Sequence, residues 1–207
     1  PSGVDGLYTA LHNFNCLINV KEMYIQNGDL HYKTNGTAKA SADVKNLNAI
    51  IKLNDLFQSG ALIDIKKALS QLSFDKIQFS SPNVKAVLEQ VNIKGALQQN
   101  SVKSATVKLV SGATINAGGI SWEKLDWDLL YKNGNIYADI ISFNNLQLQY
   151  KQVSSASKNK SKSTPALKVN NFSIGNLAAS IALLNGTEIK TKGSKINLSG
   201  LSDTEKG

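Results

Sequence analysis

Few side chains in this sequence have the types and spacing that acid–base or metal chemistry needs. His12 and His31 are the two histidines, and neither stands near a nucleophile motif of the kind that a Ser-His-Asp site requires. No pair of potential ligands has the spacing of a zinc site. Cys16 is the single cysteine and so cannot form a disulfide within the chain. The sequence therefore predicts a protein that is not an enzyme and holds no cofactor or metal.

Two charged clusters have both a chemical and a simpler interpretation. Asp126 and Asp128 lie two residues apart, so a strand places both on one face. There they are either solvated carboxylates or, if a pocket surrounds them, a paired acid site. Lys158, Lys160 and Lys162 either contact anionic lipid headgroups or belong to a solvated loop. In both cases we expect the solvated arrangement.

The positive charge of the chain comes from lysine alone. All 23 basic residues are Lys, and the net charge is +8. Arginine is the residue that reads guanine and holds phosphate at two points, so its absence weighs against specific nucleic-acid recognition. We expect a lysine-coated surface, with an electrostatic site for acidic polymers as an alternative.

The clearest periodicity in the sequence runs from Val102 to Tyr150. Apolar and polar residues alternate through Val102–Ala117, which predicts a β-strand with two unlike faces. Gly118-Gly119 is suited to a turn, and Ile120–Lys132 alternates again. Asn133-Gly134 is typical of a hairpin turn, after which Asn135–Tyr150 forms a third strand. The pattern predicts a meander of three long antiparallel strands.

One face of this meander is apolar and is the candidate binding surface. It suits either a closed core or an open groove that holds acyl chains, because both need a surface that excludes water. A structural or adhesive β-sandwich is therefore the alternative to a lipid conduit. The candidate residues are Val107, Leu109, Ile115, Leu125, Trp127, Leu129, Ile136, Ile140, Leu146 and Leu148.

The rest of the chain predicts more strands and one helix. The helix is expected over Ile65–Ser73, from a helical spacing of apolar residues. Val153–Pro165 is rich in Ser and Lys and is expected to be a loop. The expected strands are Val20–Gln26 and Asp29–Lys33 around an Asn27-Gly28 turn, then Ser41–Leu53, Phe74–Phe79, Val84–Leu97, Ala166–Ile174, Ala178–Leu184 and Glu188–Leu198.

These elements predict an all-β fold: an elongated, curved, mostly antiparallel meander of long strands with one or two short helices. We expect residues 1–207 to form a single elongated β domain, with a possible sub-boundary at the loop 153–165. No segment is apolar for long enough to span a bilayer, and Pro1-Ser2-Gly3 does not have the character of a signal peptide.

A weak internal repeat reads apolar, any residue, Asn or Gln, apolar, polar, apolar. In a regular strand the first apolar residue of this repeat faces away from the last two, so either both faces are in contact or a β-bulge restores the phase. Repeated bulges curve a sheet. The copies are Leu11–Cys16, Val44–Ala49, Leu88–Ile93, Phe143–Leu148 and Val169–Ile174.

The order of landmarks from Ala42 to Val87 resembles the AsmA-like family. In that family a strand leads to a leucine-containing loop, a small residue and a short strand, and a later strand ends in Gly-Pro or Ser-Pro before an apolar residue. Residues Lys66–Gln71 are a short insertion relative to that pattern. The matching residues are Ala42, Asp43, Val44, Leu53, Leu56, Phe57, Gly60, Leu62, Ile65, Phe74, Ile77, Phe79, Ser81, Pro82 and Val84.

The resemblance covers about a quarter of the chain well and implies a location and a partner. AsmA-like and TamB proteins are Gram-negative envelope proteins, usually anchored in the inner membrane by an N-terminal helix. Their long sheets form a β-groove with an apolar concave face, thought to carry phospholipids across the periplasm for outer-membrane biogenesis. The resemblance thus implies a periplasmic fragment of such a protein, with phospholipid as its partner and other envelope proteins as possible partners.

Overall fold

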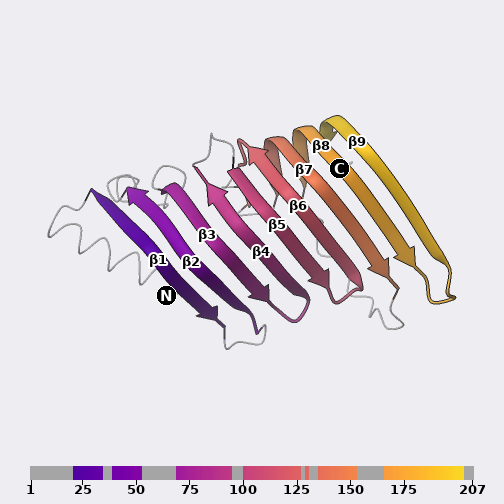
Figure 1. Cartoon of the computed structure of the whole chain (residues 1–207), viewed down its shortest axis with the longest axis horizontal. Helices are drawn as coiled ribbons and strands as arrows, with labels where there is room; N and C mark the ends of the chain where they lie inside the picture. The colour runs from indigo at the N-terminus through magenta and orange to yellow at the C-terminus, as the bar shows by residue number, and fades with distance from the viewer. Residues whose placement is uncertain are drawn as a thin grey trace.

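The computed structural model describes residues 21–34, 39–52, 69–94, 100–126, 129–130, 135–152 and 166–202. Within them, nine strands form one sheet whose spatial order follows the sequence (Figure 1). The strands are β1 Glu22–Lys33, β2 Ser41–Lys52, β3 Leu69–Ser80, β4 Val84–Ile93, β5 Asn100–Leu109, β6 Ala113–Glu123, β7 Ile136–Lys151, β8 Leu167–Ala182 and β9 Glu188–Ser202.

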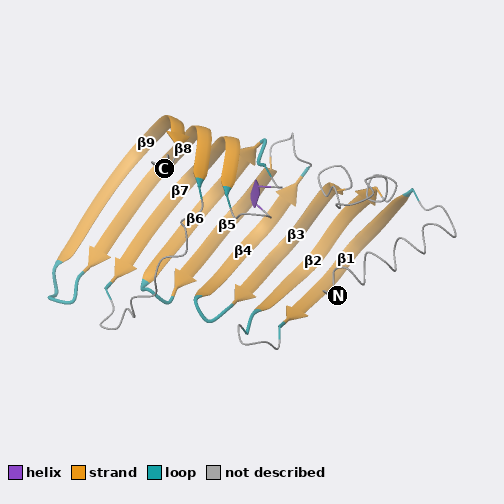
Figure 2. Cartoon of the chain, turned by 180° about the vertical axis from the view of Figure 1, so that it is seen from behind, coloured by secondary structure: helices purple, strands orange, loops and turns teal. Residues whose placement is uncertain are grey.

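The predicted fold class is confirmed. All neighbouring strands pair antiparallel except β7 and β8, which pair parallel, so the sheet is mixed but mostly antiparallel. The upper ends of β7, β8 and β9 curl over one face of the sheet (Figures 1 and 2). Among the described residues, helical geometry is confined to Leu129 and Leu130. The described part therefore forms one curved layer.

The predicted boundaries within the central meander are wrong. Val102–Ala117 is not one strand, because β5 ends at Leu109 and a turn at 110–112 leads into β6. Gly112 closes that turn with a φ of 94°, and its N–H donates to the carbonyl of Leu109 at 3.0 Å. Leu109 and Ala113 are four residues apart, so the alternation keeps its phase across the turn and is interrupted only by Ser111. For this reason the pattern did not reveal it.

The predicted helix over Ile65–Ser73 is also wrong where it is described. Residues 65–68 lie outside the described part, and Leu69–Ser73 begins β3. Leu72 pairs with Ala49 of β2 on one side and with Ile93 of β4 on the other. Strand pairing on both sides overrides the local helical spacing.

Three expected breaks lie inside continuous strands. Asn27-Gly28 lies within β1, Gly118-Gly119 within β6, and Gly175, in the gap between two predicted strands, within β8. By contrast, the chain does turn at Asn185-Gly186, in the gap between the predicted strands Ala178–Leu184 and Glu188–Leu198, with Gly186 at a φ of 84°. The three misread positions share one location in the sheet, because they align across it.

We call this alignment the first crease. At each position the regular ladder skips a pair, and two successive residues face the same side of the sheet. Several of them have left-handed φ angles: 52° at Asn27, 54° at Asn46, 49° at Gln90, 58° at Gly119 and 54° at Lys195. The crease comprises Gln26–Asn27, Lys45–Asn46, Asp75–Lys76, Glu89–Gln90, Lys103–Ser104, Gly118–Gly119, Asn144–Asn145, Gly175–Asn176 and Ser194–Lys195.

At the first crease, apolar residues three positions apart in a strand face the same side of the sheet. A Cβ placed on Gly193 would lie 3.4 Å from Cδ1 of Ile196, and one on Gly28 would lie 3.0 Å from Cγ2 of Ile25. Residues three apart in a regular strand face opposite sides, so these contacts require the added residue of a bulge. Of the two interpretations of the repeat, these contacts support the restored phase at Gly28 and Gly193. At this level the register itself shifts between β1 and β2, where the copy at Val44–Ala49 lies. The copy at Leu11–Cys16 lies outside the described residues.

A shorter second crease crosses the curled end of the sheet. It comprises Glu123–Lys124, Asp139–Ile140, Asn170–Asn171 and Ser199–Gly200, with left-handed φ angles of 51° at Lys124 and 64° at Gly200. The copy of the repeat at Val169–Ile174 spans it.

Together the creases sort the side chains into an apolar face and a polar face. One apolar row, just below the first crease, reads Leu30, Val44, Ile77, Leu88, Ala105, Ala117, Leu146, Leu177 and Gly193 across the nine strands. The next row, above the crease, reads Phe74, Val91, Val102, Ile120, Phe143, Ile174 and Ile196.

Candidate functional site

The apolar face divides at the first crease into two panels that differ in exposure. The middle panel, between the creases, is packed: Val91, Val102 and Ile174 are only 5%, 4% and 6% exposed. Each is flanked across the ladder by apolar partners, and the rings of Phe143 and Phe172 lie 5.7 Å apart. This panel has the packing of a hydrophobic core.

The open panel, which lies between the first crease and the turns at 110–112 and 183–187, exposes large apolar side chains. Its most exposed members are Leu30, Tyr32, Phe79, Leu148, Tyr150, Ile181 and Ile189, from 37% for Phe79 to 56% for Tyr32 and Ile189. The cause is an alternation of sizes. In the row of Tyr32 the ladder places Ala42, Phe79 and Ala86 in succession, so small residues stand between the larger side chains.

Half of the predicted site residues lie together on this open panel. Val107, Ile115 and Leu148 occupy one row, since Ile115 pairs with both of the others. Leu109 pairs with Val84 in the adjacent row, and Leu146 with Ala117 beside the crease.

The other predicted site residues are placed elsewhere. Ile140 pairs with Glu123 and Asn171 and lies among the polar residues of the second crease, and Ile136 pairs with Leu167 beyond it. Leu125 and Leu129 follow β6 outside any strand, and Trp127 lies outside the described residues.

The open panel also contains five residues that lie outside the central meander and were not predicted as site residues: Leu30, Tyr32, Phe79, Ile181 and Ile189. Local alternation in Asp29–Lys33 and Phe74–Phe79 already marked three of them as strand residues with an apolar face. Nothing local showed that distant strands join the same row, because only the ladder decides that.

The polar face is held together at the creases by ion pairs and amide hydrogen bonds. At the first crease the Lys45 ammonium donates to Asp29 at 2.5 Å, and the backbone N–H of Asn46 donates to the same carboxylate at 3.1 Å. The hydrogen bond from Lys45, followed by that from Asn46, lowers the pKa of Asp29, and Asp29 in turn raises the pKa of Lys45. The Asn46 side chain continues the chain of contacts to Asp75 at 2.8 Å.

The second crease repeats this arrangement around Asp139. Lys124 Nζ donates to Asp139 at 2.8 Å, and the Asn170 amide donates at 2.9 Å. The pKa of Asp139 is lowered, first by the hydrogen bond from Lys124 and then by that from Asn170, and the pKa of Lys124 is raised by Asp139. Both acidic groups therefore serve the bulges as structural partners.

The remaining polar candidates also have structural partners. His31 Nδ1 contacts the carboxylate of Asp43 at the exposed surface. Asp126 accepts a hydrogen bond from the backbone N–H of Leu129 at 3.1 Å, whereas Asp128 lies outside the described residues, as do Lys158, Lys160, Lys162, His12 and Cys16. Within the described residues no three His, Cys, Asp or Glu side chains group as metal ligands.

Two shallow hollows of about 520 and 470 Å³ lie on the polar face rather than the apolar one. The larger is lined by members of two adjacent polar rows, among them Ser104, Asn145 and Asn176 in one and Thr106, Asn116 and Gln147 in the other. These side chains form hydrogen bonds with one another. For example, the Thr106 hydroxyl donates to Asn116 at 3.0 Å, and the Asn176 amide donates to Asn145 at 3.0 Å. Neither of these two hollows of the described part is formed by the exposed side chains of the open panel.

Comparison with known proteins adds no relative: no family model, no curated protein and no solved structure matches this chain. None of the helical residues that the structure describes belongs to a helix long and apolar enough to cross a membrane.

Proposed function

We propose that the open panel binds the acyl chains of phospholipids and that this chain is a non-enzymatic segment of an AsmA-like lipid-transfer protein. One observation carries the proposal: the apolar face continues across nine strands, and on its open panel large side chains such as Tyr32, Ile181 and Ile189 are exposed. A monomeric soluble protein rarely exposes so contiguous an apolar surface unless it binds something apolar. Acyl chains fit because each methylene buried gains about 0.8 kcal/mol without requiring any directional contact.

In this proposal the acyl chains leave the apolar interior of a membrane and bind to the apolar side chains of the open panel. Acyl chains lie against the alanines that stand between the larger side chains and are held by contact alone, so they can slide along the row without breaking hydrogen bonds. The lipid headgroup stays in water at the margin of the panel. In an AsmA-like setting, the segment belongs in the periplasm, within a protein anchored in the inner membrane. There it would move phospholipid toward the outer membrane.

The test compares matched substitutions on the two faces of one strand. Leu148→Asp places a carboxylate on the open panel, and Gln149→Asp places the same group on the polar face next to it. Both side chains are exposed, so both variants should fold, as judged by circular dichroism. We expect only Leu148→Asp to lose phospholipid that co-purifies and is detected by mass spectrometry, together with binding of a fluorescent apolar dye.

A third variant, Val102→Asp, calibrates the comparison. Val102 is only 4% exposed in the middle panel, so a charge there is buried without a partner and should prevent folding. Unfolding of Leu148→Asp in the same manner, or wild-type protein that carries no lipid and binds no apolar dye, would reject the lipid-binding proposal.

The packed middle panel favours a second candidate, a structural or adhesive domain with a closed core. The low exposure of Val91 and Val102 is what a core requires. This candidate predicts that Leu148→Asp behaves like Val102→Asp.

A further inference from the structure

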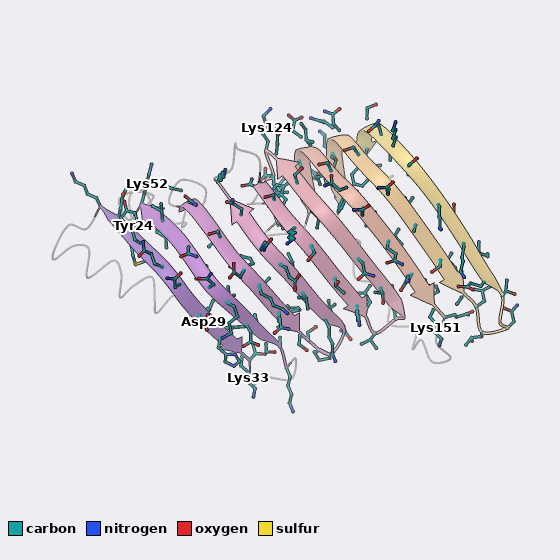
Figure 3. All side chains as sticks on the ribbon, viewed as in Figure 1. Tyr24, Asp29, Lys33, Lys52, Lys124 and Lys151 are labelled. Carbon is teal, nitrogen blue, oxygen red and sulfur yellow. The ribbon has the colours of Figure 1, made fainter. Side chains whose placement is uncertain are left out.

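The turns at one end of the sheet combine exposed apolar tips with a row of lysines. Val110, in the β5–β6 turn, is 68% exposed, and Leu184, in the β8–β9 turn, is 60% exposed. Just inside them the ladder runs through Lys33, Ser41, Ser80, Lys85, Lys108, Thr114, Gln149, Ser180 and Lys190, without a single acidic residue. We call this region the lysine end. Lys151 also belongs to it (Figure 3), as does Lys39, whose neighbour Ala40 accepts a hydrogen bond from the N–H of Thr34 after β1.

Charge is distributed unequally between the two ends of the sheet. Among the described residues at and beside the lysine row, Glu188 pairs with Lys190 at 2.9 Å, and Asp43, one polar row further in, pairs with His31. Within the described part, Lys33, Lys39, Lys85, Lys108 and Lys151 have no carboxylate at salt-bridge distance. At the opposite end, lysines are accompanied by Glu22, Glu123, Asp126 and Asp139. Figure 3 shows Lys33 and Lys151 at the lower end, far from Lys52 and Lys124 at the upper end.

The apolar tips are held in place by hydrogen bonds between neighbouring turns. The backbone N–H of Val110 donates to the carbonyl of Asn83 at 3.1 Å, and the backbone N–H of Lys151 donates to the carbonyl of Gly112 at 2.9 Å. Gln152 then accepts from the N–H of Leu184 at 3.3 Å through its side chain. The two tips thus belong to one connected rim, and the exposed Tyr32 and Tyr150 lie on the adjoining rows of the open panel.

We propose that the lysine end docks on the surface of an anionic phospholipid bilayer. Unpaired lysines around exposed apolar side chains match a surface of anionic headgroups above hydrocarbon, and tyrosines are favoured where one side is apolar and the other wet. In this orientation Val110 and Leu184 enter the headgroup layer, and the open panel meets the membrane at its edge. This inference adds a membrane surface as a partner of the proposed lipid-transfer segment. It rests on the proposed function only for what docking would achieve, namely the delivery of lipid to the open panel.

Co-sedimentation with vesicles tests the docking directly. Wild-type protein should bind vesicles of phosphatidylcholine mixed with phosphatidylglycerol, bind pure phosphatidylcholine weakly, and be released by salt. Each lysine near an anionic surface contributes roughly fivefold to partitioning, so changing Lys33, Lys85, Lys108 and Lys151 to Gln should weaken binding at least about a hundredfold. The matched control changes Lys21, Lys52, Lys94 and Lys168 to Gln at the opposite end and should retain binding.

A second measurement locates the contact. With Cys16→Ser as background, an environment-sensitive dye on Val110→Cys should shift to the blue on anionic vesicles, and the same dye on Lys21→Cys should not. Equal loss in both lysine sets, no vesicle binding by the wild type, or binding to heparin without binding to vesicles would overturn the proposal. Val110→Ser with Leu184→Ser should weaken docking yet retain co-purified lipid, which separates this inference from the acyl-chain proposal.

Discussion

The close approach of β7 and β8 at the first crease makes a measurable prediction for Gly175. A Cβ at this position would lie 2.6 Å from the carbonyl oxygen of Asn144, and that oxygen belongs to the backbone of the adjacent strand. An ordinary contact of this kind is about 3.4 Å or longer, so Gly175→Ala must push the two strands apart by several tenths of an ångström. Overpacking of this kind costs about 1–3 kcal/mol. Removing a glycine from a strand returns about 0.5–1 kcal/mol, so the net loss should be up to about 2.5 kcal/mol, with a central value of roughly 1 kcal/mol.

Gly193→Ala is the matched control. Its new Cβ would lie 3.4 Å from the flexible end of the Ile196 side chain, which can move. This variant should be neutral or slightly stabilised. Urea unfolding followed by circular dichroism gives both free energies from the shifts in midpoint at constant slope. If Gly175→Ala is as stable as Gly193→Ala, the strands do not approach closely at the crease and the bulge geometry is refuted there.

Two further predictions concern what holds the creases. Asn46→Val should lose about 1–2 kcal/mol, because a β-branched residue resists the φ of 54° and the hydrogen bond to Asp75 disappears, whereas Asn46→Gly should keep most of the stability in urea. Asp29 and Asp139 have lowered pKa values when folded, so their stabilisation is present above the ordinary carboxyl pKa and is lost as the pH falls through the folded value. Asp139→Asn should therefore reduce the loss of thermal stability between neutral and strongly acidic pH; an unchanged acid profile would contradict this role of the Lys124 pair.

The turns wrongly predicted at Asn27-Gly28 and Gly118-Gly119 have one physical origin. Asn-Gly and Gly-Gly pairs adopt left-handed φ angles readily, and sequence alone cannot distinguish a hairpin from a bulge, since both use that conformation. At Asn27 and Gly119 every neighbouring strand carries a bulge at the same level, so the chain continues instead of turning. At Val110–Gly112 the chain does turn, although the alternation keeps the same phase on both sides of Ser111.

What the sequence alone determined is the class of fold and the presence of an apolar face. Alternation is a local property of each strand, and it predicted an all-β, mostly antiparallel sheet with Val107, Ile115 and Leu148 on one apolar face. Their row was not predicted, because Val107 and Ile115 were expected in a single strand and instead pair across β5 and β6. The sequence also indicated a β-bulge as one explanation of the repeat. Within each six-residue copy the first apolar residue is out of phase with the last two, and this mismatch is visible in the sequence itself.

Only the tertiary structure decided which apolar residues are exposed and how the ends of the sheet differ. Exposure of Tyr32 or Ile181 depends on the size of partners in other strands, such as Ala42, which are remote in the chain. The lysine end exists because β1, β4, β5 and β9 bring single lysines into one row, and the ladder register that aligns them is set by pairing between strands. No local pattern contains that register, so neither the open panel nor the lysine end could be predicted from the sequence.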